Sequence, residues 1–213
     1  MGGFDKVIGH TQIIGYFQKA SAQDKLAHSY IITGEKGSGK KLLTGIFAKT
    51  LQCEGQGMEP CGECRSCKQS ESGNQPDIIW VTHEKPNTIS VADIRSQVNG
   101  DISIKPYSGK YKVYIIDQAE KMNEQAQNAL LKTIEEPPSY AVILSLASQT
   151  GSFLPTILSR CITLSLKPVE EERIKEYILT HTCLTKEEAD FCAGYSMGNL
   201  GKAMDLATNE TRI

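Results

Sequence analysis

The sequence predicts an α/β fold in which a parallel five-stranded sheet lies between helices. Short apolar runs alternate with amphipathic segments along residues 1–166, and this alternation is typical of a parallel sheet covered on both faces. A glycine-rich turn joins the first apolar run to a helix-forming segment. From residue 167 onward the chain is poor in strand-forming segments. We therefore expect residues 1–166 to form an α/β domain and residues 167–213 a small lid of three helices.

The expected elements follow from local patterns. Apolar runs predict strands at residues 30–33, 78–82, 113–116, 142–147 and 162–166. Apolar residues at spacings of three and four predict helices at residues 1–29, 40–53, 90–98, 123–136, 155–160, 169–180, 185–193 and 200–207. Ser90 with Asp93, and Thr185 with Glu188, resemble capping boxes. Pro137 is expected to end the helix that Asn123 begins.

Composition excludes several classes of protein. The chain has 213 residues and a formal net charge of -2, so it can bury a sizeable core and has no overall attraction to nucleic acid or to a membrane surface. No apolar run approaches the roughly 18 residues of a membrane span, and the N-terminus lacks the apolar region of a signal peptide. We expect a cytoplasmic protein whose thiols are reduced, so its seven cysteines need an explanation other than disulfides.

The segment Gly34–Lys41, GEKGSGKK, follows the spacing of a phosphate-binding P-loop except at its last position. Its glycines would let backbone N–H groups converge on phosphate oxygens, and Lys40 would reach the outer phosphates. The last residue should be Ser or Thr, whose hydroxyl binds Mg²⁺, but Lys41 has no acceptor atom. Whether ATP or ADP binds stays open, and a glycine-rich turn without a ligand is the alternative. The candidate nucleotide-binding residues of the loop are Gly34, Gly37, Gly39, Lys40 and Lys41.

The strand at residues 113–116 ends in Asp117, which it would deliver to the edge of the sheet where parallel sheets bind ligands. A phosphate-binding NTPase would use this Asp to orient Mg²⁺ and would place a water-activating Glu directly after it. Here Gln118 follows, and an amide can orient a water molecule but cannot take a proton from it. Lys41 and Gln118 together therefore predict a degenerate site that does not hydrolyse ATP.

Four cysteines, Cys53, Cys61, Cys64 and Cys67, form the pattern C-x7-C-x2-C-x2-C. This spacing brings thiolates close enough to share one Zn²⁺ ion, and four thiolates would leave no open coordination position, so the metal would be structural. Four unrelated buried thiols are the alternative. The remaining three are predicted to be small core residues: Cys161, Cys183 and Cys192.

Ser159, Arg160 and Cys161 follow a helix-like segment and precede the fifth expected strand. A lone arginine at such a place is usually the partner in a surface ion pair. The alternative is an arginine finger, which would place its guanidinium on the γ-phosphate held by a neighbouring subunit. Three residues alone do not decide between these interpretations.

Three features together carry a family resemblance: the segment Asn128–Pro138 (NALLKTIEEPP), the four-cysteine insertion after the P-loop helix, and Ser159-Arg160-Cys161. Over essentially all its length the chain resembles the AAA+ clamp-loader subunits of bacterial DNA polymerase III. The resemblance implies a RecA-like α/β domain, a three-helix lid and a helical collar domain that joins five subunits into a ring. Because the chain stops after the lid, it resembles an N-terminal fragment without the collar.

Within this family, Lys41 and Gln118 favour the delta-prime type of subunit over the gamma/tau type, which hydrolyses ATP. Gln149 lies near the position called sensor 1, and residues 198–203 resemble the sensor 2 segment without its Arg. The resemblance implies that Arg160 completes the ATP site of an adjacent gamma/tau subunit and that the four cysteines hold zinc. It also implies gamma/tau and delta subunits, a sliding clamp and primed DNA as partners, with no enzymatic activity of the chain by itself.

Two other functions remain as alternatives. An ATP-hydrolysing motor subunit of the gamma/tau type would tolerate Lys41 and have its base supplied from elsewhere. A zinc-dependent nucleic-acid-binding module would use the C-x2-C pairs, although the acidic total charge and the absence of interleaved aromatic and basic residues count against it.

Overall fold

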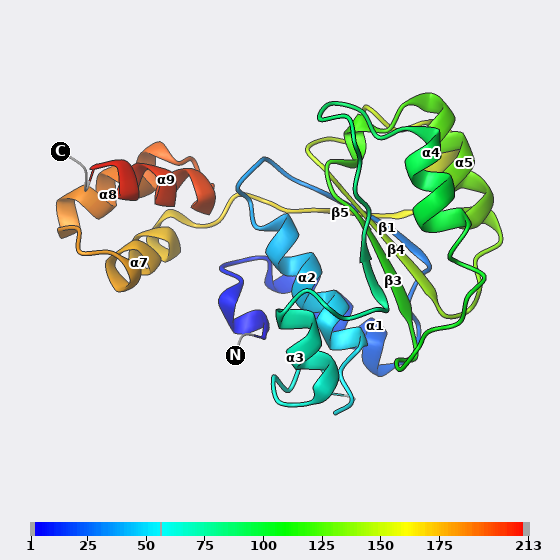
Figure 1. The fold of residues 1–213 in the computed structure, drawn as a ribbon. Coiled ribbons are helices and arrows are strands. Elements are labelled where there is room, and N and C mark those ends of the chain that lie inside the picture. The colour runs from blue at the N-terminus through cyan, green and yellow to red at the C-terminus, as the bar shows by residue number, and fades with distance from the viewer. Residues whose placement is uncertain (1–2, 56, 211–213) are drawn as a thin grey trace.

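The computed structural model describes residues 3–55 and 57–210 (Figure 1). Its centre is a five-stranded parallel sheet in the order β2-β3-β4-β1-β5. The strands are β1 (Ser29–Thr33), β2 (Ile78–Trp80), β3 (Lys112–Ile116), β4 (Ala141–Ala147) and β5 (Ile162–Ser165). The α/β fold class that the sequence predicts is confirmed.

The three central strands, β1, β3 and β4, are buried along their whole length, as their unbroken apolar runs predict. In β3, alternate residues face opposite sides of the sheet, so that Tyr114 and Ile116 pack on one side and Val113 and Ile115 on the other. The edge strands β2 and β5 are more exposed. β4 lies between β1 and β3, and because the strands are parallel, the carboxyl ends of all three lie at the same end of the sheet.

Helices cover both faces of the sheet (Figure 1). One face carries α1 (Thr11–Ala22) and α2 (Lys40–Leu51), and the other carries α4 (Val91–Ile94) and α5 (Glu124–Glu135). On the first face the rings of Phe17 and Phe47 stack with their centroids 3.8 Å apart. The shorter elements are the helices α3 (Arg65–Glu71) and α6 (Pro155–Leu158), the π-helix Arg95–Asn99 that continues α4, and the 3₁₀ turns Phe4–Lys6 and Ala119–Lys121.

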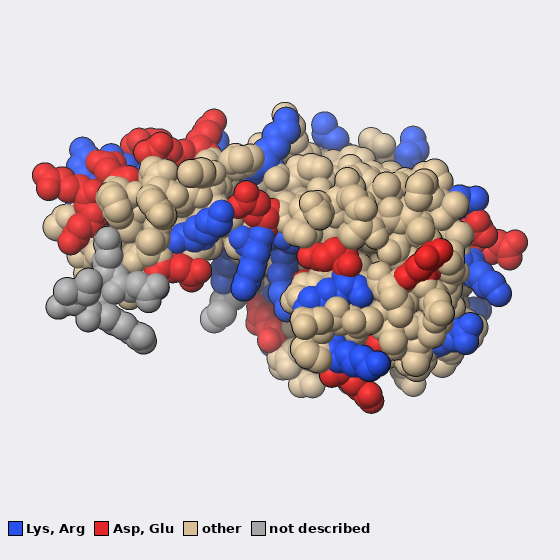
Figure 2. Space-filling model, turned by 90° about the horizontal axis from the view of Figure 1, so that it is seen from above, with Lys and Arg blue, Asp and Glu red and all other residues tan. Residues whose placement is uncertain are grey.

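The last three helices have an apolar core of their own. They are α7 (Glu171–His181), α8 (Lys186–Tyr195) and α9 (Leu200–Glu210), and they enclose Ile174, Ile178, Ala189, Cys192 and Ala203. Figure 2 shows acidic side chains grouped over this end of the molecule, at the left of the view. The separate core supports a division of the chain near residue 166, which remains a proposal.

Some expectations were wrong in detail. Residues 1–29 do not form one helix: among the described residues of this segment the α-helix covers only Thr11–Ala22, because Gly9 and His10 have positive φ angles of 79° and 56°. Ile8 therefore packs against the core of α7, α8 and α9 instead of joining Phe17 on one helix face. The helix α3 was not expected, and Cys183 is exposed and not part of a core.

Both predicted capping boxes are confirmed, at Ser90 with Asp93 and at Thr185 with Glu188. Asn123 caps α5 by accepting a hydrogen bond from the backbone of Ala126, also as predicted. Within residues 3–55 and 57–210, no helix combines the length and the apolar composition that a membrane crossing requires.

Candidate functional site

The glycine-rich loop connects the carboxyl end of β1 to the first turn of α2, as the sequence predicts. Gly37 and Gly39 have φ angles of 88° and 89°, a conformation that favours glycine. Asp117, directly after β3, faces the loop across the end of β4, and a cavity of 540 Å³ lies between them. Its polar lining consists of Lys36, Lys40, Lys41, Asp117, Gln118, Glu120 and Ser148.

Lys40 folds back onto its own loop. Its Nζ donates hydrogen bonds to the carbonyl oxygens of Gly34 at 2.5 Å and Glu35 at 2.8 Å. Burial lowers the pKa of the Lys40 ammonium, and the nearby carboxylates of Glu120 and Asp117 oppose that shift. Lys40 thus lies at the position that a P-loop requires, close to the carboxylates of Glu120 and Asp117.

Lys41 forms an ion pair with Asp117, whose Oδ2 lies 3.0 Å from the Lys41 Nζ. The same ammonium lies 5.3 Å from the ring centroid of Trp80. In a P-loop that uses Mg²⁺, a hydroxyl at position 41 and the carboxylate at position 117 would both offer oxygen atoms to the metal site. Here an ammonium, which has donors only, takes the place of the hydroxyl and binds the carboxylate. The residues present do not fit a Mg²⁺ ion.

Gln118 has a left-handed φ of 53°, and its side chain is exposed. The sequence analysis missed a second carboxylate in this cavity, that of Glu120. Its Oε1 accepts hydrogen bonds from the hydroxyl of Ser148 at 3.0 Å and from the Ser148 backbone at 3.3 Å, while its Oε2 is buried without a partner among the described residues. The signal that could have found it is the acidic residue three positions after Asp117. Gln149, next to Ser148, does not line the cavity.

The first turn of α9 lies directly on the loop. The Gly201 backbone N–H donates to the Gly37 carbonyl at 3.0 Å, and Asn199 Nδ2 donates to the Lys36 carbonyl at 2.8 Å. Lys202 Nζ lies 2.7 Å from Oε2 of Glu35. These residues belong to the segment that resembles sensor 2, and the structure places that segment against the loop.

His10 supports the loop from the other side, because its Nε2 lies 3.1 Å from the carbonyl oxygen of Ser38. Burial lowers the pKa of His10, and the contact with the Ser38 carbonyl opposes this shift. A second cavity of 230 Å³ adjoins this contact and is lined in part by His10, Thr11, Val169 and Arg173. His10 therefore has a structural role at the loop.

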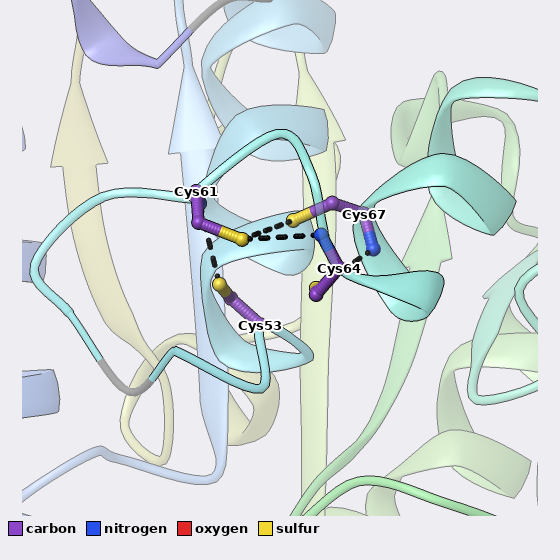
Figure 3. Close-up of side chains that lie close together, drawn as sticks. All are labelled: Cys53, Cys61, Cys64 and Cys67. Carbon is purple, nitrogen blue, oxygen red and sulfur yellow. Dashed lines mark hydrogen bonds between the residues drawn. The ribbon is translucent and has the colours of Figure 1, made fainter.

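The four cysteines of the C-x7-C-x2-C-x2-C pattern converge, with their sulfur atoms all within 4.8 Å of one another (Figure 3). Backbone N–H groups point at three of the sulfurs: Cys61 at Cys53 Sγ, Cys64 at Cys61 Sγ and Cys67 at Cys64 Sγ, over 3.3–3.4 Å. Hydrogen bonds from the Cys64 and Glu63 backbones lower the pKa of Cys61 to about 6. Burial raises the pKa of Cys67 to about 12. The cluster could hold a metal ion.

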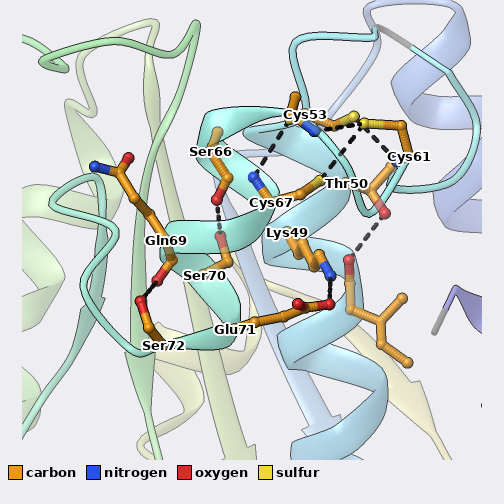
Figure 4. A network of polar contacts seen from close by, with 12 residues as sticks. Lys49, Thr50, Cys53, Cys61, Ser66, Cys67, Gln69, Ser70, Glu71 and Ser72 are labelled. Atoms are coloured by element: carbon orange, nitrogen blue, oxygen red, sulfur yellow. Dashed lines mark hydrogen bonds and ion pairs between the residues drawn. The ribbon is translucent and has the colours of Figure 1, made fainter. Parts of the chain in front are cut away.

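The cysteine cluster joins two helices (Figure 4). Cys53 follows the end of α2, and Cys64 caps α3 by accepting from the Cys67 backbone. An ion pair of 2.6 Å between Lys49 of α2 and Glu71 of α3 fixes the same two helices further along. The polar sequence of α3 contains no helical apolar pattern, so its helical fold depends on this cluster and its cap.

Arg160 lies near the amino ends of the strands, whereas the glycine-rich loop lies at their carboxyl ends. Its guanidinium forms an ion pair of 3.0 Å with Glu135 and donates to the Thr156 carbonyl at 3.1 Å. Because Ile162 of β5 stands opposite Tyr30 of β1, Arg160 is level with residue 28, six residues before the loop. At 3.3 Å per residue this separation is about 20 Å. Arg160 therefore does not reach the loop of its own chain.

A parallel sheet with this loop after β1, an acidic residue after β3 and a three-helix lid defines the class of P-loop AAA+ proteins. Residues 9–170 match the family model described as DNA polymerase III, delta subunit. The chain is 36% identical over 189 residues to DNA polymerase III subunit tau/gamma of Haemophilus influenzae, covering 88% of this chain and 27% of that protein. It is 33% identical over 189 residues to subunit delta' of Bacillus subtilis, covering 88% and 56%.

Among solved structures, the chain is similar to a DNA polymerase III gamma subunit-related protein of Thermotoga maritima. The TM-score is 0.61 at 22% identity, over 92% of this chain and 57% of that one, and this likeness concerns the fold alone. The chain belongs to the family of DNA polymerase III clamp-loader subunits. Its relatives include both tau/gamma and delta' subunits. The chain spans 27% of the Haemophilus influenzae tau/gamma subunit and 56% of the Bacillus subtilis delta' subunit.

Proposed function

We propose that the chain is a clamp-loader subunit of the delta-prime type, which does not hydrolyse ATP and lends Arg160 to the ATP site of a neighbouring subunit. Its partners would be gamma/tau and delta subunits in a heteropentameric ring in the cytoplasm, and through the ring a sliding clamp and primed DNA. The observation that carries the proposal is the distance of about 20 Å along the strands between Arg160 and the loop of its own chain. An arginine so placed is out of reach of the loop of its own chain, so a phosphate that it contacts would be held by another chain.

The surroundings of Arg160 support this role. Its side chain is 41% exposed, and its ion-pair partner Glu135 is 42% exposed. Exposed pairs of this kind contribute little to stability, so the guanidinium can exchange Glu135 for a phosphate at small cost. Arginine suits that exchange because its planar fork binds phosphate oxygens with two hydrogen bonds.

The cysteine cluster would hold structural zinc. Four sulfurs at about 2.3 Å from a tetrahedral Zn²⁺ lie about 3.8 Å from one another, and Cys61 Sγ and Cys67 Sγ are already 4.0 Å apart. All four ligand positions would be filled by thiolates, so the ion would take no part in a reaction. Its contribution would be to hold α3 against α2.

One observation favours the alternative, an ATP-hydrolysing subunit of the gamma/tau type. Glu120 lines the cavity beside the loop, and its Oε2 is without a partner among the described residues. A carboxylate in this place could act as the base that Gln118 cannot provide. Steady phosphate release by the chain alone, lost in Glu120→Gln and in Lys40→Ala, would support this alternative and would contradict our proposal.

The proposal is tested with Arg160→Ala in a loader reconstituted from ATP-hydrolysing subunits of the same source. Removal of an arginine finger lowers turnover by about 10³–10⁵, and we expect clamp-stimulated ATPase to fall by orders of magnitude. Arg173→Ala is the matched control, since Arg173 is half exposed and pairs with Glu170 on the lid. Unchanged turnover in the Arg160→Ala loader would refute the proposed role.

A further inference from the structure

We propose that the loop site takes the phosphates of a nucleoside di- or triphosphate without a divalent cation, with the ammonium of Lys41 at the position of the metal. The inference rests on the proposed function only in treating the loop as a site that does not hydrolyse ATP. It concerns how the loop of this chain binds a ligand, and not how Arg160 acts on a neighbour.

The position of the Lys41 side chain carries the inference. Lys41 is the residue whose hydroxyl would bind Mg²⁺ in a complete P-loop, and its Nζ lies 3.0 Å from Oδ2 of Asp117. The carboxylate that would orient the metal is thus already neutralised by a cation attached to the chain. A Mg²⁺ ion entering here would gain no ligand from Lys41 and would meet a like charge.

The charges around the cavity suit an anion. Three lysines, at positions 36, 40 and 41, face two carboxylates, those of Asp117 and Glu120, across the 540 Å³ cavity. The volume lies within the range of small-molecule sites, about 300–1,000 Å³. Gln118 is neutral and removes the third negative charge that a glutamate would have added. A phosphate chain therefore meets a net positive lining before any metal is supplied.

Lys40 and Lys41, the last two residues of the loop, still have N–H donors for a ligand. An ammonium has three N–H donors, and Lys40 uses two of them on the carbonyls of Gly34 and Glu35 within the described part of the chain. Lys41 is 67% exposed at its side chain and sits on a flexible stem. It can therefore keep Asp117 and also donate to a phosphate oxygen, which is a strong, charge-assisted contact.

The fluorescence of Trp80 provides a signal for ligand binding. Trp80 is the one tryptophan of the chain, and its ring lies 5.3 Å from the Lys41 Nζ, so a ligand that moves Lys41 should change its fluorescence. We would titrate the whole chain with ATP, ADP and adenosine, once in EDTA and once in Mg²⁺, at equal ionic strength. Calorimetry on the same samples provides a second signal that does not depend on the ring.

We expect ATP and ADP to bind in EDTA, and Mg²⁺ to leave the affinity within about twofold or to weaken it, because the metal has no ligand to gain. Adenosine should bind at least about tenfold more weakly, since it lacks the groups that form the charge-assisted contacts. Tightening by Mg²⁺ of tenfold or more would overturn the proposal. So would equal binding of adenosine, or no binding of either nucleotide.

Lys41→Thr restores the hydroxyl and removes the ammonium. We expect it to weaken binding in EDTA by about tenfold or more, the usual effect of losing a charge-assisted hydrogen bond, and to make Mg²⁺ strengthen binding. Lys25→Thr removes the same charge from an exposed site before β1, at the opposite edge of the sheet, and should bind like the original chain. If Lys41→Thr bound equally well in EDTA, the proposal would be wrong even though Arg160→Ala still abolished turnover.

Discussion

The guanidinium of Arg160 lies 3.0 Å from Oε1 of Glu135, and each side chain is about two-fifths exposed. The contact joins the segment before β5 to the last residue of α5. It holds the arginine at the edge of the sheet opposite the glycine-rich loop. An ion pair this exposed contributes little to stability, so the Arg160 side chain can leave Glu135 at small energetic cost.

Glu135→Gln should therefore change the free energy of unfolding by less than about 1 kcal/mol, the value typical of exposed pairs, and should leave the ATPase of a reconstituted loader active. Arg160→Lys keeps the charge but loses the planar fork, so we expect it to lower the ATPase strongly with the same small effect on stability. Urea unfolding and ATPase assays on both variants check this. A loss of several kcal/mol in Glu135→Gln would show that the pair is structural.

The cysteine cluster should carry a metal that stabilises the fold. We expect Cys64→Ser to lose the bound metal and to lower the free energy of unfolding by more than about 2 kcal/mol, because metal binding is coupled to folding. Cys183→Ser, at an exposed cysteine outside the cluster, should retain both. Elemental analysis and denaturant unfolding measure the two effects. Equal metal content in the two variants would contradict the assignment.

The close contact between Gly201 and Gly37 should tolerate no side chain. A Cβ on Gly201 would lie 2.6 Å from the Gly37 Cα, so we expect Gly201→Ala to displace α9 and to cost about 1–3 kcal/mol, as overpacking does. Gly15→Ala, on α1, is the matched control: apart from its chain neighbours and the backbone of its own helix, no atom of the described residues lies within 4 Å of the added Cβ, and alanine should stabilise the helix by about 0.5–1 kcal/mol. Thermal unfolding of both variants tests the difference, and destabilisation of equal size would contradict it.

The contact of α9 with the loop should weaken in acid. Hydrogen bonds from Lys202 and Asn199 hold the pKa of Glu35 below its usual value of 4.5. A carboxyl group with a lowered pKa contributes stability that is complete above its unfolded pKa and is lost as the pH falls through its folded pKa. Glu35→Gln should thus be less stable than the original chain at neutral pH, and the two should converge well below pH 4.5. Unfolding curves measured across this range should show the convergence, and a constant difference would refute the pair's role.

Much of the fold was predictable because β1, β3 and β4 are fully buried strands, and their apolar runs record that burial directly. The prediction of one helix over residues 1–29 was wrong because Gly9 and His10 adopt left-handed conformations, which no apolar pattern reveals. The helix α3 was not predicted because its stability comes from the cysteine cluster and the Cys64 cap, and not from a buried face.

The site was predictable as a set of residue types and less so as a geometry. The P-loop spacing located Lys40 and Lys41, and the apolar run 113–116 located Asp117. The four cysteines meet as their spacing predicts. The pairing of Lys41 with Asp117 spans 76 positions, and Lys202 reaches Glu35 across 167. Such contacts depend on the order of strands in the sheet and on where the lid packs, which local patterns do not encode.

The placement of Arg160 and the loop at opposite edges gives the molecule a direction. Head-to-tail neighbours, in which the arginine of one chain meets the loop of the next, build rings or open arcs. Under the proposed function the chain would donate an arginine at one end of its strands and would hydrolyse no ATP at the other, so it would fit at the end of such an arc.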